Sequence, residues 1–109
     1  MSASILILTL NEEANISACL ASVSRFPDVV VLDSYSGDRT VSLAQESGAR
    51  VIQRKFDNWA AHQNWALEHI TFKHPWVFYI DADERMTDEL AAEIQAIAAD
   101  LRRSEAAFY

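Results

Sequence analysis

Two aspartates separated by one residue, Asp81 and Asp83, directly follow an apolar run at Trp76–Ile80. In extended backbone, side chains two residues apart point to the same side, so both carboxylates can face one site. Proteins usually hold Mg²⁺ or Mn²⁺ with one or two carboxylates, and water and substrate phosphates complete the coordination. Such an ion would bridge a diphosphate and neutralise charge that develops on a leaving phosphate. The spacing therefore predicts a divalent-metal site; the alternative is a solvated acidic loop that precedes a helix.

Two more polar clusters each follow an apolar run. Thr9–Glu13 comes after Ile5–Leu8, and Asp33–Thr40 comes after Val29–Leu32. Carboxylates that crowd together repel one another, so they usually face a cation or the hydroxyl and amide donors of a ligand. We expect all three clusters to converge on one ligand site.

Other chemistries that use paired aspartates fit this sequence poorly. A haloacid dehalogenase phosphatase needs Thr or Val where this chain has Arg85, and it carries the motif after its first strand. An EF-hand loop counted from Asp81 needs Gly at its sixth position and Glu at its twelfth, where this chain has Met86 and Ala92. The two glycines of the chain cannot form a dinucleotide-binding or P-loop motif. Phosphate binding is therefore expected to depend on a metal.

The spacing of apolar residues predicts the elements that position these clusters. Continuous apolar runs predict strands at 5–10, 29–32, 51–53 and 76–80. Helical periodicity and capping signals predict helices at about 16–23, 38–47, 60–70 and 88–101. Strands that alternate with helices predict an α/β fold with a mostly parallel, Rossmann-like sheet and helices on both faces. In such sheets ligands bind beyond the carboxyl ends of the strands, where the three polar clusters lie.

Capping residues support these helices. We expect Asp38 to cap the second helix and Gly48 to end it in the left-handed conformation. Thr87 is the expected cap of the last helix, and two acidic residues follow it in the first turn.

Several apolar and aromatic residues are assigned packing roles. Cys19 lies on the apolar stripe of the first helix and is expected in the core. Trp59 and Trp65 are expected to pack the third helix onto the sheet. His62 and His69 have no cysteine partner and no zinc-ligand spacing, so we expect surface or packing roles for both.

Composition limits the class of protein. The chain has 109 residues and a formal net charge of −7, and half of its residues are hydrophobic. This fits one globular domain, and the acidic balance argues against nucleic-acid binding, which normally needs a basic surface. No apolar run reaches the roughly 18 residues needed to cross a bilayer, and no basic segment precedes the apolar start, as a signal peptide requires. The single cysteine fits a reducing compartment. We expect a cytoplasmic protein with no transmembrane segment in this chain.

Taken together, the motifs resemble those of family 2 glycosyltransferases with the GT-A fold. The matching positions are Thr9-Leu10-Asn11-Glu12, then Asp33, Ser36, Asp38 and Thr40, then Gln63-Asn64 in part, and finally Asp81-Ala82-Asp83. Residues 56–67 and 81–85 most resemble the branch of bacterial lipopolysaccharide-core glucosyltransferases.

The resemblance implies transfer of a sugar, glucose in that branch, from a UDP-sugar to a lipopolysaccharide or other glycan acceptor, with Mn²⁺ or Mg²⁺ as cofactor. It implies metal binding by Asp83 and Asp81. The nucleotide-sugar-binding residues that it implies are Leu8, Thr9, Leu10, Asn11, Glu12, Asp33, Ser34, Ser36, Gln63, Asp81 and Ala82. Ser34 and Gln63 depart from the family pattern, because many members have a second Asp at the first position and Arg or Lys at the second.

The resemblance also implies that residues 1–109 are the N-terminal nucleotide-sugar-binding part of a GT-A domain. An apolar segment at Ala106–Tyr109 reads as the start of another strand, which predicts a longer protein. The acceptor site and the carboxylate base of an inverting transfer are then expected beyond Tyr109. A lipid-linked acceptor would bring the enzyme to the cytoplasmic face of the inner membrane, and an exposed sheet edge would favour a homodimer.

Three other functions stay open at this point. A nucleotidyltransferase of related fold needs a glycine-rich, basic segment after the first strand, where this chain has Asn11–Glu13. A phosphoacceptor receiver domain needs clustered acids after the first strand and a lysine after a fifth strand. The third alternative is a chain that binds nucleotide and catalyses nothing, which we favour for residues 1–109 alone.

Overall fold

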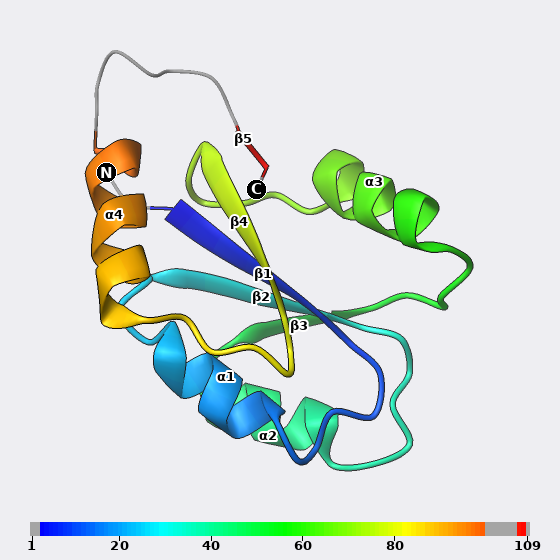
Figure 1. Ribbon diagram of the computed structural model, residues 1–109. Coiled ribbons are helices and arrows are strands. Elements are labelled where there is room, and N and C mark those ends of the chain that lie inside the picture. The colour runs from blue at the N-terminus through cyan, green and yellow to red at the C-terminus, as the bar shows by residue number, and fades with distance from the viewer. Residues whose placement is uncertain (1–2, 100–106, 109) are drawn as a thin grey trace.

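The computed structural model describes residues 3–99 and 107–108, and its strands form one parallel sheet (Figure 1). The elements are β1 (Ala3–Thr9), α1 (Ile16–Ser22), β2 (Asp28–Asp33), α2 (Thr40–Glu46), β3 (Arg50–Gln53), α3 (Trp59–His69), β4 (Trp76–Asp81), α4 (Asp88–Ala98) and β5 (Ala107–Phe108). The sheet order is β3-β2-β1-β4-β5, and each paired strand runs parallel to its neighbour. The predicted α/β architecture is therefore confirmed.

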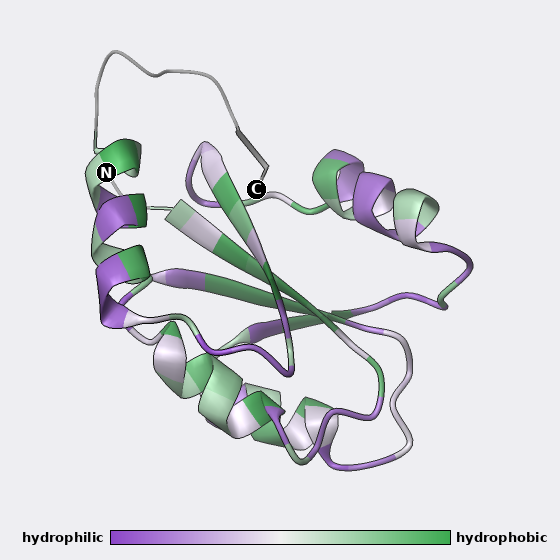
Figure 2. Ribbon diagram, viewed as in Figure 1, coloured by the Kyte–Doolittle hydropathy of each residue, from purple (hydrophilic) through white to green (hydrophobic). Residues whose placement is uncertain are grey.

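Helices cover both faces of the sheet. Buried residues of α1, α2 and α4 pack with Ile5 and Ile7 of β1 in one core cluster. Leu6 and Leu8 of the same strand belong to a second cluster, together with Ala66 of α3. Successive side chains of a strand point to opposite faces, and all seven residues of β1 are buried, because each face has its own helical cover. Figure 2 shows the resulting hydrophobic colour through the middle of β1.

The helix boundaries differ from the predicted ones by one or two residues. Helix α2 begins at Thr40 rather than at 38; Arg39 holds the cap position, but the Asp38 carboxylate accepts the backbone N–H of Thr40 at 2.9 Å. Asp38 therefore supplies the expected capping bond from one position earlier. Helix α3 begins at Trp59, and Asn58 caps it by accepting the Ala61 N–H at 2.9 Å.

The other capping predictions are confirmed. Gly48 follows α2 with a φ of 87°, in the left-handed region that glycine adopts without strain. The Thr87 side chain accepts the Leu90 N–H, and two acidic residues follow it in the first turn of α4. Cys19 is fully buried, as expected of a core residue, and burial raises the pKa of its thiol to about 11. The last predicted turn of α4 lies outside the described residues.

A buried aspartate joins three strands at the amino edge of the sheet. Asp28 accepts hydrogen bonds from the Ser4 hydroxyl at 2.6 Å, from the Arg50 guanidinium and from the Lys73 N–H. Burial by itself raises the pKa of Asp28, but these donors outweigh that effect and hold the pKa below its usual value. The cluster is fully paired and ties β1, β2 and β3 together away from the polar loops.

None of the helices in the described part of the chain is long and apolar enough to span a bilayer.

Candidate functional site

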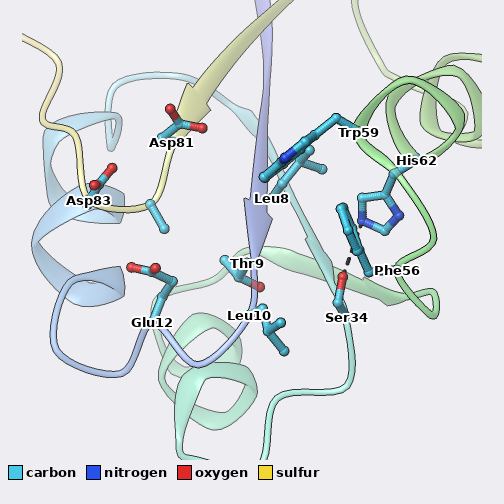
Figure 3. A pocket seen from close by; sticks show the side chains of 11 residues that line it. Leu8, Thr9, Leu10, Glu12, Ser34, Phe56, Trp59, His62, Asp81 and Asp83 are labelled. Carbon is cyan, nitrogen blue, oxygen red and sulfur yellow. Dashed lines mark hydrogen bonds between the residues drawn. The ribbon is translucent and has the colours of Figure 1, made fainter.

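A cavity of about 440 Å³ opens at the carboxyl edge of the sheet (Figure 3). Its lining residues are Leu8, Thr9, Leu10, Glu12, Ser34, Phe56, Trp59, His62, Asp81, Ala82 and Asp83. Strand order changes direction at β1, because β2 and β3 lie on one side of it and β4 on the other. The cavity therefore lies at the topological switch point, where α/β sheets bind ligands.

Three carboxylates gather on one side of the cavity. Figure 3 shows Asp81, Asp83 and Glu12 grouped there, across β1 from the aromatic residues. The Tyr79 hydroxyl donates to Asp81 Oδ1, and the Asp81 N–H donates to Glu84 at 2.9 Å. These contacts hold the start of the β4–α4 loop, and Asp81 lines the cavity. Asp83 is exposed at the mouth.

The environment of Tyr79 keeps its hydroxyl protonated. Burial raises the pKa of Tyr79 well above its usual value, and the hydrogen bond to Asp81 and the nearby acidic charges raise it further. The phenol therefore stays a donor, which fixes the orientation of the Asp81 carboxylate.

Aromatic side chains form the opposite wall of the cavity. Phe56 packs edge-on against Trp59 at 5.2 Å between ring centroids and against His62 at 5.5 Å. Trp59 is 59% exposed and lines the cavity, so the prediction that it packs α3 onto the sheet is wrong. The prediction is right for Trp65, which packs against the second core cluster.

His62 connects this wall to Ser34. The imidazole is 1% exposed; its Nε2 lies 3.4 Å from Ser34 Oγ, and its Nδ1 lies 3.0 Å from the Arg54 guanidinium. Arg54 in turn forms a bidentate ion pair with Asp57, in which Nη1 donates to Oδ1 at 2.9 Å and Nη2 donates to Oδ2 at 3.0 Å. Burial, helped by the Arg54 charge, lowers the pKa of His62 below its usual value, so the ring is neutral at pH 7.

Asp33 does not line the cavity, although the sequence predicted a binding role for it. Its side chain is fully buried and accepts four hydrogen bonds, from Thr9 Oγ1 at 2.7 Å, from the Ser36 N–H and hydroxyl, and from Gln53 Nε2. Burial alone raises the pKa of Asp33, but these donors outweigh burial and lower it. All the acceptor capacity of Asp33 is used inside the protein, and its neighbour Ser34 reaches the cavity instead.

Asn11 and Ser36 connect two loops instead of lining the cavity. The Asn11 N–H donates to Ser36 Oγ at 2.8 Å, and the Asn11 side chain accepts the Gly37 N–H at 2.8 Å. Asn11 has a φ of 54°, a conformation that Asn tolerates better than most residues. The pair therefore fixes the β1–α1 loop against the β2–α2 loop, both of which border the cavity.

The structure brings together eight of the twelve predicted site residues. Those on the cavity wall are Leu8, Thr9, Leu10, Glu12, Ser34, Asp81, Ala82 and Asp83. Gln63 is half-buried on α3 and lies outside the wall, which His62 reaches from the preceding position.

Sequence reasoning missed Phe56, Trp59 and His62 as cavity residues. All three follow β3, whose carboxyl end lies at the same edge as those of β1, β2 and β4. The segment after the third strand could therefore have been predicted to border the ligand site from its position alone. It was missed because it contains no acidic cluster like those after the other strands.

The sequence profile described as Glycosyl transferase family 2 matches residues 4–104. The chain belongs to this family. Lipopolysaccharide core biosynthesis glycosyltransferase LpsC from Rhizobium meliloti is 37% identical over 89 residues, which are 77% of this chain and 32% of that protein. An uncharacterized glycosyltransferase from Rickettsia bellii is 37% identical over 94 residues, or 85% of this chain and 31% of that protein. This glycosyltransferase-family chain thus spans about a third of the length of these curated relatives.

Solved structures support the same assignment. Glucosyl-3-phosphoglycerate synthase from Mycobacterium tuberculosis, crystallised with Mn²⁺, UDP and glucosyl-3-phosphoglycerate, aligns with a TM-score of 0.63 and 28% identity, over 74% of this chain and 33% of that one. The same enzyme with UDP aligns with a TM-score of 0.64 over 76% of this chain and 34% of that one. The expected family and its GT-A fold are confirmed for this chain.

Proposed function

We propose that residues 1–109 bind the nucleotide part of a UDP-sugar, as the N-terminal part of a glycosyltransferase that transfers a hexose to a glycan acceptor. The observation that carries the proposal is the division of one cavity into an aromatic wall and a carboxylate wall at the switch point of a parallel sheet. Flat rings suit a nucleobase, and carboxylates suit ribose hydroxyls or a metal that carries a diphosphate. UDP in the similar mycobacterial enzyme supports this choice of ligand.

The residues present fit a divalent cation. Asp83 is exposed, and the carboxylates of Asp81 and Asp83 line the same side of the cavity. No group of three or more metal-binding side chains is preformed among residues 3–99, which suits an ion that takes its other ligands from water and phosphate. We propose that Asp83, with Asp81, holds Mn²⁺ or Mg²⁺, which when bound neutralises charge on the diphosphate leaving group. The Mn²⁺ in the similar enzyme supports this role.

The acceptor is proposed from the relatives. The relative LpsC is named a lipopolysaccharide core biosynthesis glycosyltransferase, which supports a lipopolysaccharide or other glycan as the acceptor. We propose glucose as the transferred sugar. We place the acceptor site and the base outside residues 1–109. A lipid-linked acceptor would be met at the cytoplasmic face of the inner membrane, and pairing along an exposed sheet edge, where the remainder of the enzyme would otherwise pack, would give a homodimer.

Calorimetric titration with UDP, with and without Mn²⁺, tests the proposal. We expect Mn²⁺ to strengthen UDP binding, and we expect Asp83→Asn to abolish most of that gain. Glu93→Gln, on the exposed surface of α4, removes one negative charge elsewhere and should keep the gain. A UDP affinity that does not change with Mn²⁺ would contradict the metal role. So would an Asp83→Asn variant in which Mn²⁺ strengthens UDP binding as much as it does in Glu93→Gln. A chain that binds no UDP would contradict the proposed function.

A further inference from the structure

The contact between His62 and Arg54 fixes which nitrogen of the imidazole carries the proton. A guanidinium group has donors only, so His62 Nδ1, at 3.0 Å from Arg54, must accept. The hydrogen of the neutral ring is then on Nε2. Asp57 holds Arg54 through two hydrogen bonds, and Arg54 lies 5.7 Å from the Trp65 ring centroid, so the guanidinium is fixed from two further sides.

This tautomer determines what Ser34 presents to the cavity. His62 Nε2 lies 3.4 Å from Ser34 Oγ, so its N–H donates to that oxygen. A hydroxyl that accepts from one neighbour has its own proton to donate elsewhere. Ser34 lines the cavity beside Phe56, so its O–H can donate to a ligand that lies against the aromatic wall.

We infer that His62 is a positioning residue that makes Ser34 a hydrogen-bond donor to the nucleobase and thereby selects a base with a carbonyl oxygen at that point. This inference rests on the proposed function. We place position 4 of the base at Ser34, because the two bases share the carbonyl oxygen at position 2 and differ at position 4. Uracil carries a carbonyl oxygen there, which can accept from Ser34, whereas cytosine carries an amino group, which can only donate. The hydrogen-bonded chain of Asp57, Arg54, His62 and Ser34, in which His62 is the buried member, therefore favours uridine over cytidine nucleotides.

The test compares the dissociation constants of UDP and CDP for wild type and variants, by calorimetry with Mn²⁺ present. We expect wild type to prefer UDP, and His62→Leu to reduce the preference by about fivefold to tenfold, the usual range for one lost hydrogen bond. His62→Gln should keep the preference, because its amide can accept from Arg54 and donate to Ser34 as the imidazole does. His69→Ala changes an exposed histidine of the same helix and should leave the preference unchanged.

Ser34→Ala is a second, independent test of the UDP preference, because it changes a half-buried residue instead of the buried His62. It should lose the preference to the same extent as His62→Leu, and the double variant should lose no more. A folded His62→Leu or Ser34→Ala variant that discriminates like wild type would overturn the inference. Equal weakening of UDP and CDP would also overturn it while leaving the nucleotide site intact, whereas a wild-type chain that binds neither nucleotide would overturn the proposed function.

Discussion

Asp33 and Ser34 are consecutive residues at the end of β2, and they have opposite surroundings. Asp33 pairs in register with Thr9 of β1 and Gln53 of β3, and its carboxylate accepts hydrogen bonds from both side chains. Ser34 reaches the cavity and the imidazole of His62. Neighbouring side chains in extended backbone point to opposite faces, and of these two only Ser34 lines the cavity. The carboxylate stabilises the edge of the sheet, and the hydroxyl is left for binding.

Asp33→Asn should therefore destabilise the protein more than it alters the cavity. The new amide group would place a donor against the hydroxyl and N–H donors that the carboxylate now accepts, at a cost of about 1–3 kcal/mol. The free energy of unfolding in urea measures this loss. Glu93→Gln is the exposed control and should stay within about 0.5 kcal/mol of wild type. An Asp33→Asn variant as stable as this control would show that the buried contacts contribute little.

Among the helices, α3 positions the aromatic wall of the cavity. It is the helix that contributes to the second core cluster, through Ala66 and Trp65, and its first turn carries Trp59 and His62 to the cavity. Asn58 fixes where this turn begins, because its side chain accepts the Ala61 N–H. The loop before it is held by the ion pair of Arg54 and Asp57. The aromatic wall thus depends on one cap and one short ion-paired loop.

We expect Asn58→Ala to cost about 1 kcal/mol of unfolding free energy, the usual value of a lost helix cap. It should also weaken UDP binding, because fraying of the first turn displaces Trp59 and His62 together. Urea unfolding and UDP titration measure the two effects. Glu68→Ala, exposed near the C-terminal end of the same helix, should change neither. Loss of stability with unchanged UDP affinity would mean that the first turn keeps its place without the cap.

At the scale of the whole molecule, a sheet buried on both faces supports one polar edge. The amino edge is closed by the paired Asp28 cluster, whereas the carboxyl edge carries the loops and the cavity. Part of the negative charge of the chain is concentrated there, in Asp81, Asp83 and Glu12. A bound cation would relieve their mutual repulsion.

His62 makes the stability of the whole fold depend on pH. Its pKa is lowered on folding from an ordinary value of 6.5, so the unfolded chain binds a proton more tightly than the folded protein does. Its contribution to stability is therefore complete above pH 6.5 and is lost as the pH falls from 6.5 toward the lowered value. Urea unfolding between pH 5 and 8 should show this decline in wild type and a smaller one in His62→Gln. Equal slopes in the two proteins would contradict the buried, neutral state of His62.

The sequence alone determined the architecture and the family, because local patterns encode both. Apolar runs such as Ile5–Leu8 can be stable only as strands covered on both faces, and alternation with helices makes those strands parallel. Parallel strands end at one edge, so the order of the elements along the chain is enough to assign the clusters after β1, β2 and β4 to a common site. The cap at Thr87 and the left-handed Gly48 followed from local backbone chemistry in the same way.

Which side chains face the cavity depends on packing between segments that are distant in the chain. Whether Asp33 or Ser34 points inward depends on the register of three strands, which no local pattern fixes. His62 has the sequence context of an ordinary helical histidine, and only the packing of α3 brings it within reach of Ser34, 28 residues earlier in the chain. Its protonated nitrogen is set by Arg54, on the loop before the helix. Side-chain direction and hydrogen-bond partners arise from contacts between distant segments, and those contacts exist only once the chain has folded.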